Sequence, residues 1–298
     1  MNIESLKYFH AVANIGSISR VASNSHISQP ALSQQIQKLE EVLGYKLLNR
    51  SNKGVALTEA GRIVQKYSKT LIKSYDNMLE DLTVIDTTNN TVRIDSSPTI
   101  ATYSLPCTIY TMKEEYPGYK ICLSTNLSEE VEHSVINEVS DFGFIHGMPY
   151  ESSLQAARVG VDRLVVVASQ GITIDNEVVL KDLLNYQLIL LLDRFKVTQE
   201  IRSHFQKSDY DLNDFNILLS LDSIESIKST VIKGYGISIL PYVSVKKELY
   251  SQQLKEVKVK ELDMNYEIYL VYKQDKEIRR CVKNCISFFK KIGEKSFC

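Results

Sequence analysis

Residues 27–50 read ISQPALSQQIQKLEEVLGYKLLNR, and this stretch decides the fold of the amino-terminal part of the chain. Ser28 is a good N-cap, because its hydroxyl can accept hydrogen bonds from the free amides of a first helical turn. Pro30 suits that turn, where amides have no intrahelical partner. Gly44 can end the helix in the left-handed conformation. Between these ends, apolar residues at helical spacing predict one buried stripe, formed by Leu32, Ile36, Leu39 and Leu43.

The opposite face of this predicted helix carries amides and hydroxyls. Such groups can read base edges in the major groove of DNA, where glutamine is a fitting partner for adenine. The residues that we expect at the DNA are Ser28, Gln29, Pro30, Ser33, Gln34, Gln37 and Lys38. A helix that only packs on its own domain can carry the same pattern, so the face alone leaves that alternative open.

The flanking residues predict a winged helix-turn-helix. Ile3, Leu6 and Phe9 lie on one face of a first helix, which the residues 14–16 interrupt, and Ser17 can cap a second helix over residues 18–23. Two short helices joined by a tight turn place the second one, here the helix after Ser28, in the groove. Residues 50–57 predict a hairpin wing, in which Arg50 and Lys53 are placed for phosphates.

The first sixty positions resemble the amino-terminal domain of LysR-type transcriptional regulators. The matching residues are Leu6, Phe9, Gly16, Ser17, Ile18, Ala22, Ser28, Gln29, Pro30, Ala31, Leu32, Ser33, Ile36, Leu39, Glu40, Leu43, Gly44, Leu47, Leu48, Arg50, Leu57, Thr58, Ala60 and Gly61. The sequence departs from the family pattern at 19–22, where Ala-Ala usually follows the variable pair, at Gln34, often Arg, and at Leu48, usually Phe. The resemblance implies a cytoplasmic regulator that binds double-stranded promoter DNA, with an operator sequence of its own.

A long helix is predicted from Thr58 to about Ile85. Residues at intervals of seven form an apolar seam on a charged helix, which favours a partner helix over packing on its own domain. We expect this seam to be the dimerisation surface, formed by Val64, Leu71, Met78 and Ile85. The resemblance implies antiparallel pairing with the same helix of a second chain. Polar residues 86–90 then predict a joint between domains.

From Thr91 onwards, short apolar strands alternate with helices, which predicts α/β layers with mainly parallel sheets. The resemblance extends here through Leu105-Pro106, Tyr116-Pro117, Asp141-Phe142-Gly143 and Gly234 to Pro241. It implies a two-lobed effector domain like a periplasmic binding protein, with strands near 163–169 and 267–272 crossing between the lobes. The expected domains are 1–58 (DNA-binding), 59–90 (linker helix and hinge) and 91–298 (effector-binding), with lobe one at about 91–161 and 269–298 and lobe two at about 162–268.

A small-molecule effector is expected in a cleft between the lobes, near helix amino termini whose amides attract anions. Two loops of lobe one and one of lobe two supply the candidate residues Ser97, Thr99, Thr102, Ser128, Arg194, Lys196 and Thr198. The family register places Thr99 and Ser128 at positions that commonly touch the effector, although helix capping explains them equally well. Arg194, Lys196 and Thr198 can close on a carboxylate or remain at the surface. We therefore expect a small polar, anionic metabolite and no cofactor.

The charge distribution agrees with DNA binding. The whole chain of 298 residues has a formal net charge of −1. Residues 1–66 hold eight Lys and Arg against four Glu, a surplus of four positive charges, which leaves a net −5 for the remainder. Positive charge thus lies where phosphate contacts are proposed. Because the surplus is modest, we expect a homodimer or homotetramer to supply the rest, with contact to RNA polymerase possible after DNA bending.

Other classes of protein fit the sequence less well. The five cysteines are an odd number and the five histidines are scattered, which indicates no disulfide framework or metal site but leaves a redox-sensing regulator as an alternative. The motifs of hydrolases, phosphate-binding loops and dinucleotide sites are missing, so we expect no enzyme. A solute-binding protein without a DNA role would need an export signal, and none opens the chain. No apolar run is long enough to span a membrane.

Overall fold

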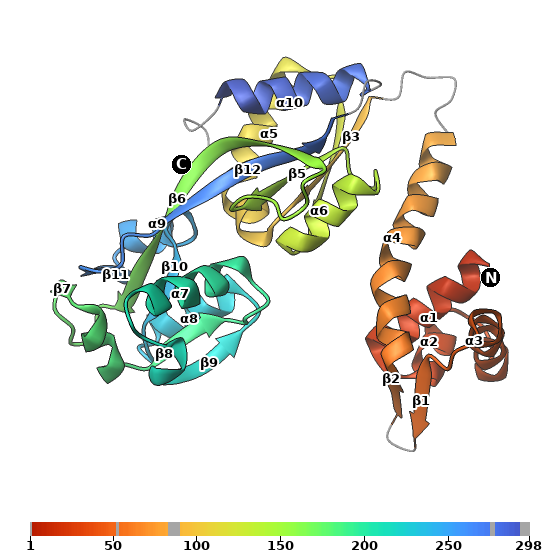
Figure 1. Cartoon of the computed structure of the whole chain (residues 1–298), viewed down its shortest axis with the longest axis horizontal. Coiled ribbons are helices and arrows are strands. Elements are labelled where there is room, and N and C mark those ends of the chain that lie inside the picture. Colours follow the sequence, from red (N-terminus) through yellow and green to blue (C-terminus); the bar gives the residue numbers. More distant parts are fainter. Residues whose placement is uncertain (1, 52–53, 83–89, 275–277, 293–298) are drawn as a thin grey trace. The chain divides into compact units, whose positions relative to one another are not determined.

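The computed structural model describes residues 2–51, 54–82, 90–274 and 278–292 (Figure 1). The chain divides into two compact units, 1–89 and 90–298. Among the described residues, no helix is long and apolar enough to cross a membrane. Each unit has its own core and is taken by itself below.

The amino-terminal unit is a winged helix-turn-helix with a long fourth helix. Its elements are α1 (Ile3–Ile15), α2 (Ile18–Asn24), α3 (Gln29–Leu43), β1 (Leu48–Ser51), β2 (Gly54–Leu57) and α4 (Glu59–Leu82). The Ser28 hydroxyl accepts from the Ala31 amide at 3.3 Å, and Gly44 ends α3 at φ 74°, as the sequence predicts. Leu32, Ile36 and Leu39 are buried with residues of α1 and α2. The fold predicted for this part is confirmed.

The start of α4 is fixed against the wing by a close backbone approach. A Cβ on Gly61 would lie 2.1 Å from the carbonyl oxygen of Leu47, so only glycine fits there. The Thr58 hydroxyl donates to the Lys46 carbonyl at 2.7 Å and accepts from the Gly61 amide at 2.9 Å. These contacts cap the helix and join it to the residues that enter β1.

The carboxyl-terminal unit is a two-lobed α/β domain. Its elements are β3 (Thr91–Ser96), the π-helical η1 (Ile100–Ser104), α5 (Leu105–Glu115), β4 (Lys120–Thr125), α6 (Ser128–Ile136), β5 (Phe142–His146), β6 (Leu154–Ser169), β7 (Glu177–Val178), η2 (Leu180–Asn185), β8 (Leu188–Leu191), α7 (Lys196–Lys207), η3 (Leu212–Asp214), β9 (Ile217–Leu221), α8 (Ile224–Ile232), β10 (Ser238–Pro241), α9 (Tyr242–Tyr250), β11 (Leu254–Val259), β12 (Asn265–Lys273) and α10 (Arg280–Ile292).

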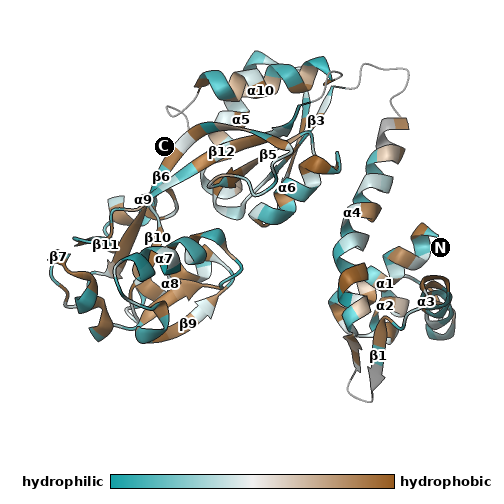
Figure 2. Cartoon of the chain, in the orientation of Figure 1, coloured by the Kyte–Doolittle hydropathy of each residue, from teal (hydrophilic) through white to brown (hydrophobic). Residues whose placement is uncertain are grey.

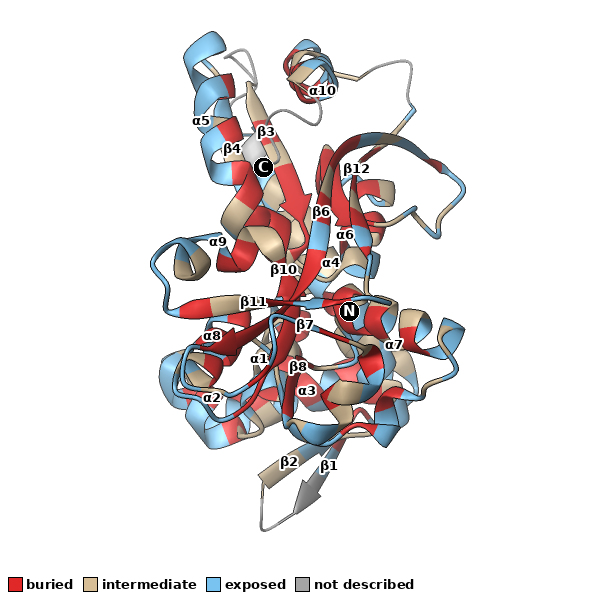
Figure 3. Cartoon of the chain, turned by 90° about the vertical axis from the view of Figure 1, so that its left-hand side faces the viewer, coloured by how far each residue is buried: buried red, intermediate tan, exposed pale blue. Residues whose placement is uncertain are grey.

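Two long strands, β6 and β12, run from one lobe into the other (Figure 1). Val159 and Ile268 belong to the core of lobe one, whereas Leu164 and Tyr266 belong to the core of lobe two. Strand β6 therefore passes from lobe one to lobe two between residues 159 and 164, and β12 passes between the lobes at residues 266–268. Beyond the crossing, β10 and β11 pair with β6, and Figure 3 shows β10 and most of β6 as buried.

The expectation of mainly parallel sheets is wrong. The strand order of the large sheet is β4-β3-β5-β12-β6-β11-β7, and β10 also pairs with β6. Strand β3 pairs in parallel with β4 and β5. Strands β12 and β6 instead pair antiparallel with each other and with β5, β10 and β11. The crossing strand also begins at Leu154 and not at Arg163. Its first half mixes exposed, half-buried and buried residues, so it lacks the continuous apolar run that marks residues 163–169 as a strand.

Candidate DNA-binding and effector-binding sites

The face of α3 opposite its buried stripe is open to solvent. Gln29, Gln34, Gln37 and Lys38 are exposed, as are Ser28 and Pro30 at its start, while Ser33 is half-buried. The Gln37 amide donates to Glu41 at 3.0 Å, a weak surface contact that DNA can replace. Gln35 is excluded from this face, because its side chain accepts from the Ser5 hydroxyl at 2.8 Å. An exposed row of amides on a rigid helix can meet base edges in a major groove.

Glu40 fixes this helix to the wing. Its Oε1 accepts from the backbone amides of Leu47 at 2.7 Å and Leu48 at 3.2 Å, and its Oε2 lies 3.2 Å from the Lys46 ammonium. Burial by itself raises the pKa of this carboxyl, but the two amides and Lys46 outweigh burial, and the pKa lies below its ordinary value. Glu40 thus remains charged in the folded protein. In the sequence, Glu40 is marked only by the family pattern.

The wing is a short antiparallel hairpin in which Ser51 pairs with Gly54. The Val55 amide donates to the Gly16 carbonyl at 3.1 Å, which holds the wing against the turn between α1 and α2. The sequence predicts two phosphate contacts in the wing, Arg50 and Lys53. Lys53 and the side chain of Arg50 lie outside the described residues.

The outward side of α4 carries an apolar stripe, and Figure 2 shows hydrophobic and hydrophilic residues interspersed along this helix. Leu71 and Met78 of the predicted seam are 48% and 47% exposed, but Val64 packs partly against the amino-terminal core and Ile85 lies outside the described residues. The exposed members, here called the α4 stripe, are Ile63, Tyr67, Leu71, Met78 and Leu82. Val64 thus packs on its own domain, and its part in dimerisation stays a prediction.

The lobe-one candidates follow strands β3 and β4. Ser97 and Thr99 are buried, Ser128 is half-buried and Thr102 is exposed. Capping does not occupy the hydroxyls of Thr99 and Ser128: Thr99 makes no side-chain cap bond to η1, and Ser128 is the first residue of α6, after the N-cap Leu127. Helix capping, the alternative explanation for these two residues, therefore does not use either hydroxyl.

The lobe-two candidates behave differently. The buried Thr198 hydroxyl donates to the Leu191 carbonyl at 2.9 Å and so holds the loop that precedes α7. Arg194 is exposed, 3.9 Å from the Asp222 carboxylate, with its guanidinium 5.4 Å from the Phe195 ring centre. Both side chains thus find their partners within lobe two.

Lys196 is a lobe-two cation that contacts lobe one. Its ammonium donates to the Tyr150 hydroxyl, lies 4.5 Å from the centre of that ring, and lies 3.7 Å from the Glu200 carboxylate. A second bridge joins the lobes elsewhere, where the Tyr103 hydroxyl donates to Glu225 at 2.6 Å. Glu225 in turn lies 2.8 Å from the ammonium of Lys228.

Sequence reasoning missed His146, the last residue of β5. Its ring stacks on Tyr266 at 3.9 Å between centres, and its Nδ1 lies 3.2 Å from the Ser97 hydroxyl. Burial lowers the pKa of His146 to about 3, so the ring is neutral. Among the described residues, nothing pairs with its Nε2. In the sequence, His146 shows only as a polar residue at the end of an apolar strand. A histidine that is buried and hydrogen-bonded for purely structural reasons gives the same pattern.

The described residues contain no group of three His, Cys, Asp or Glu side chains able to hold a metal ion. Cys281 and Cys285 are buried free thiols, and burial raises the pKa of Cys285 to about 12, which disfavours the reactive thiolate. Cys107 is exposed and Cys298 lies outside the described residues. The redox alternative gains no support from this geometry.

A winged helix-turn-helix joined to a two-lobed α/β domain defines a DNA-binding regulator controlled by a small ligand. The chain belongs to the LysR family. Residues 3–62 match the model of the bacterial regulatory helix-turn-helix protein, lysR family, and residues 86–293 match the LysR substrate binding domain. The protein is thus a LysR-type transcriptional regulator that binds DNA and carries an effector-binding domain, and it is not an enzyme.

Relatives in sequence and solved structures of the same fold agree with this family assignment. A probable RuBisCO transcriptional regulator of Gracilaria tenuistipitata var. liui is 29% identical over 255 residues, which cover 83% of this chain and 82% of the relative. One of Trichormus variabilis is also 29% identical, covering 83% of this chain and 75% of the relative. The LysR family regulator CbnR has the same fold, with a TM-score of 0.73 at 18% identity, over 99% and 100% of the two chains. The Synechocystis CcmR regulatory domain in complex with 2-PG matches 68% of this chain and 97% of its own, with a TM-score of 0.62 at 18% identity.

Proposed function

We propose that the protein binds a promoter element as a homodimer or homotetramer and that an anionic metabolite, bound where the two lobes meet, controls its effect on transcription. The observation that carries the DNA-binding half is the exposed amide face of α3, held in place by the buried Glu40. Gln34 and Gln37 are assigned to bases. Lys38, Arg50 and Lys53 are assigned to phosphates, which position a protein without reading sequence.

The α4 stripe supports self-association. Its residues are large, apolar and about half exposed, and a second copy of α4 laid antiparallel would remove them from water. Two recognition helices would then meet two half-sites of a roughly palindromic operator. Pairing of dimers, and contact with RNA polymerase after a change in DNA bending, complete the proposal. Such a regulator acts beside the chromosome, in the cytoplasm.

The effector half rests on the free hydroxyls of lobe one and a cation of lobe two. Thr99 and Ser128 have no capping bond, and Ser97, Thr102 and the amides at the start of α6 lie in the same loops. Lys196 is a cation that meets lobe one at Tyr150 and can attract an anion.

The CcmR domain was solved with 2-PG, which supports a small anionic ligand for a domain of this fold. Arg194 can join only by leaving Asp222, and Thr198 supports the loop.

The test is calorimetry of the full-length protein with 2-PG, with other small phosphorylated or carboxylic acids, and with their neutral analogues. We expect heat from at least one acid and none from its uncharged analogue. Binding of neutral or cationic molecules alone would refute the anionic effector. Footprinting of the same preparation on genomic DNA tests the regulator half independently, because specific protection does not require the effector.

A further inference from the structure

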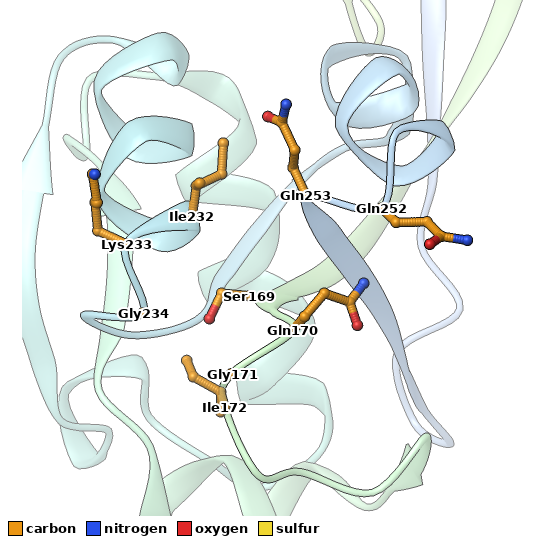
Figure 4. Close-up of a pocket in the computed structure, with 9 residues that line it drawn as sticks. All are labelled: Ser169, Gln170, Gly171, Ile172, Ile232, Lys233, Gly234, Gln252 and Gln253. Atoms are coloured by element: carbon orange, nitrogen blue, oxygen red, sulfur yellow. The ribbon is translucent and has the colours of Figure 1, made fainter.

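Lobe two contains a pocket that lies away from the boundary between the two lobes. It lies beside the last residue of β6, the end of that strand farthest from its crossing into lobe one. Residues 169–172, 232–234 and 252–253 line it, and its volume is about 510 Å³. Figure 4 shows these three segments facing one another around the space. Small-molecule sites in proteins generally have volumes of this order.

The floor of the pocket carries the hydroxyl of a buried serine. Ser169 is 5% exposed, and no described residue forms a hydrogen bond with its Oγ. In Figure 4 this hydroxyl points into the space between Gly171 and Gly234. The oxygen atom itself is open to the pocket and is not a buried unsatisfied group, so a ligand that enters can form a hydrogen bond with it.

Two glycines keep this hydroxyl uncovered. Gly234 follows the end of α8 at φ 80°, a conformation that favours glycine, and a Cβ there would lie 3.4 Å from the Ser169 Oγ. Gly171 adopts no such conformation. A Cβ on Gly171 would meet the same oxygen at 4.0 Å, an ordinary contact. Its lack of a side chain therefore preserves the pocket and is not required by the backbone.

The charges at the pocket disfavour an anion. Helices α8 and α9 both end here, and the carboxyl ends of helices carry partial negative charge. Lys233 is the charged side chain of the lining, and Figure 4 shows it extending away from Ser169. The other polar groups are the side-chain amides of Gln170, Gln252 and Gln253, which both donate and accept hydrogen bonds; the Gln170 Nε2 already donates to the Leu254 carbonyl at 3.2 Å.

We propose that this pocket binds a neutral, hydroxyl-rich molecule of about the size of a sugar. Ligand hydroxyls can donate to glutamine oxygens and to the last carbonyls of the two helices, and they can accept from Ser169 and the glutamine amides. Ile172 and Ile232 offer apolar contact to the C–H groups of such a molecule. The site goes beyond the anionic effector proposed for the lobe boundary and takes a ligand of different charge.

The site is tested by saturation-transfer NMR on the full-length protein with D-glucose, D-ribose and myo-inositol. We expect transfer to at least one of them, with no displacement by inorganic phosphate. Gly171→Leu fills the pocket and should abolish transfer, and Ser169→Ala should weaken binding about tenfold. Gly118→Leu is the matched control, because a Cβ on Gly118 has open space around it. Melting curves establish that each variant is folded.

The site would be overturned by no transfer to any of the three compounds, by equal transfer in folded Gly171→Leu, or by displacement by phosphate. Thr99→Val separates this proposal from the effector at the lobe boundary. Binding of the neutral ligand should be unchanged in this variant. If the variant loses that binding, the neutral ligand binds at the lobe boundary and not in this pocket.

Discussion

The carboxylate of Glu40 in α3 accepts the backbone amide of Leu47 at 2.7 Å, and this bond joins the recognition helix to the wing. The same oxygen accepts the Leu48 amide at 3.2 Å. Helix and wing therefore move as one rigid piece when they approach DNA. An interface whose parts are already ordered loses less entropy on binding.

Glu40→Ala should destabilise the amino-terminal unit by about 1–3 kcal/mol, because two buried amides lose their acceptor. DNA affinity should fall as well, since the wing is no longer held. Urea unfolding and gel-shift titration measure the two effects. Glu4→Ala is the control, because Glu4 is exposed in the first turn of α1, outside α3 and the wing, and should change neither by much. Because the folded pKa of Glu40 is lowered, its stabilisation is complete above the ordinary pKa and is lost as the pH falls through the folded value.

Gln34→Ala should reduce base discrimination at specific operator positions by about 1–3 kcal/mol. Lys38→Ala should instead weaken binding to all sequences alike and lower the salt slope by about one. Selection of bound DNA from a random pool, followed by titration at several salt concentrations, distinguishes the two. An unchanged base preference in Gln34→Ala would remove Gln34 from the readout.

Met78→Glu should shift the protein towards monomers, because it places a charge inside the proposed antiparallel helix pair. Operator affinity should fall with it, since a single unit has few basic residues. Light scattering after size-exclusion chromatography measures the mass. Lys66→Glu, an exposed position of α4 outside the stripe, is the control and should keep the assembly of the wild type. A Met78→Glu protein that remains dimeric would contradict the seam.

Thr99→Val should abolish the response to the effector and leave DNA binding intact, because it removes a hydroxyl that makes no capping bond. Thr111→Val, at an exposed position of α5, is the matched control. Calorimetry with the identified acid and footprinting with and without it supply the two readouts. A Thr99→Val protein that fails to fold would instead favour a structural role.

His146 should make the carboxyl-terminal unit less stable in acid. Its folded pKa of about 3 lies below the ordinary value, so stability is complete above about pH 6.5 and declines by about 1.4 kcal/mol per pH unit below it. Burial raises the pKa of Asp162 to about 6, which opposes this trend between its ordinary value and pH 6. His146→Gln should therefore flatten the decline in melting temperature on acidification. An equal decline in both proteins would assign it to other groups.

The sequence by itself determined the helix-turn-helix and the class of protein. Its signals were local: the Ser28 cap, the stripe at Leu32, Ile36 and Leu39, and the Gly44 stop all act within one helix, so residue spacing reveals them. The alternation of strands and helices after Thr91 likewise indicated α/β layers.

Only the tertiary structure decided what depends on distant partners. The antiparallel course of β6, the stack of His146 on Tyr266, the bond from Glu40 to Leu47 and the uncovered hydroxyl of Ser169 each join residues brought together by folding. Burial changes the chemistry of such groups, through desolvation and lost or gained partners, and no spacing along the chain records it.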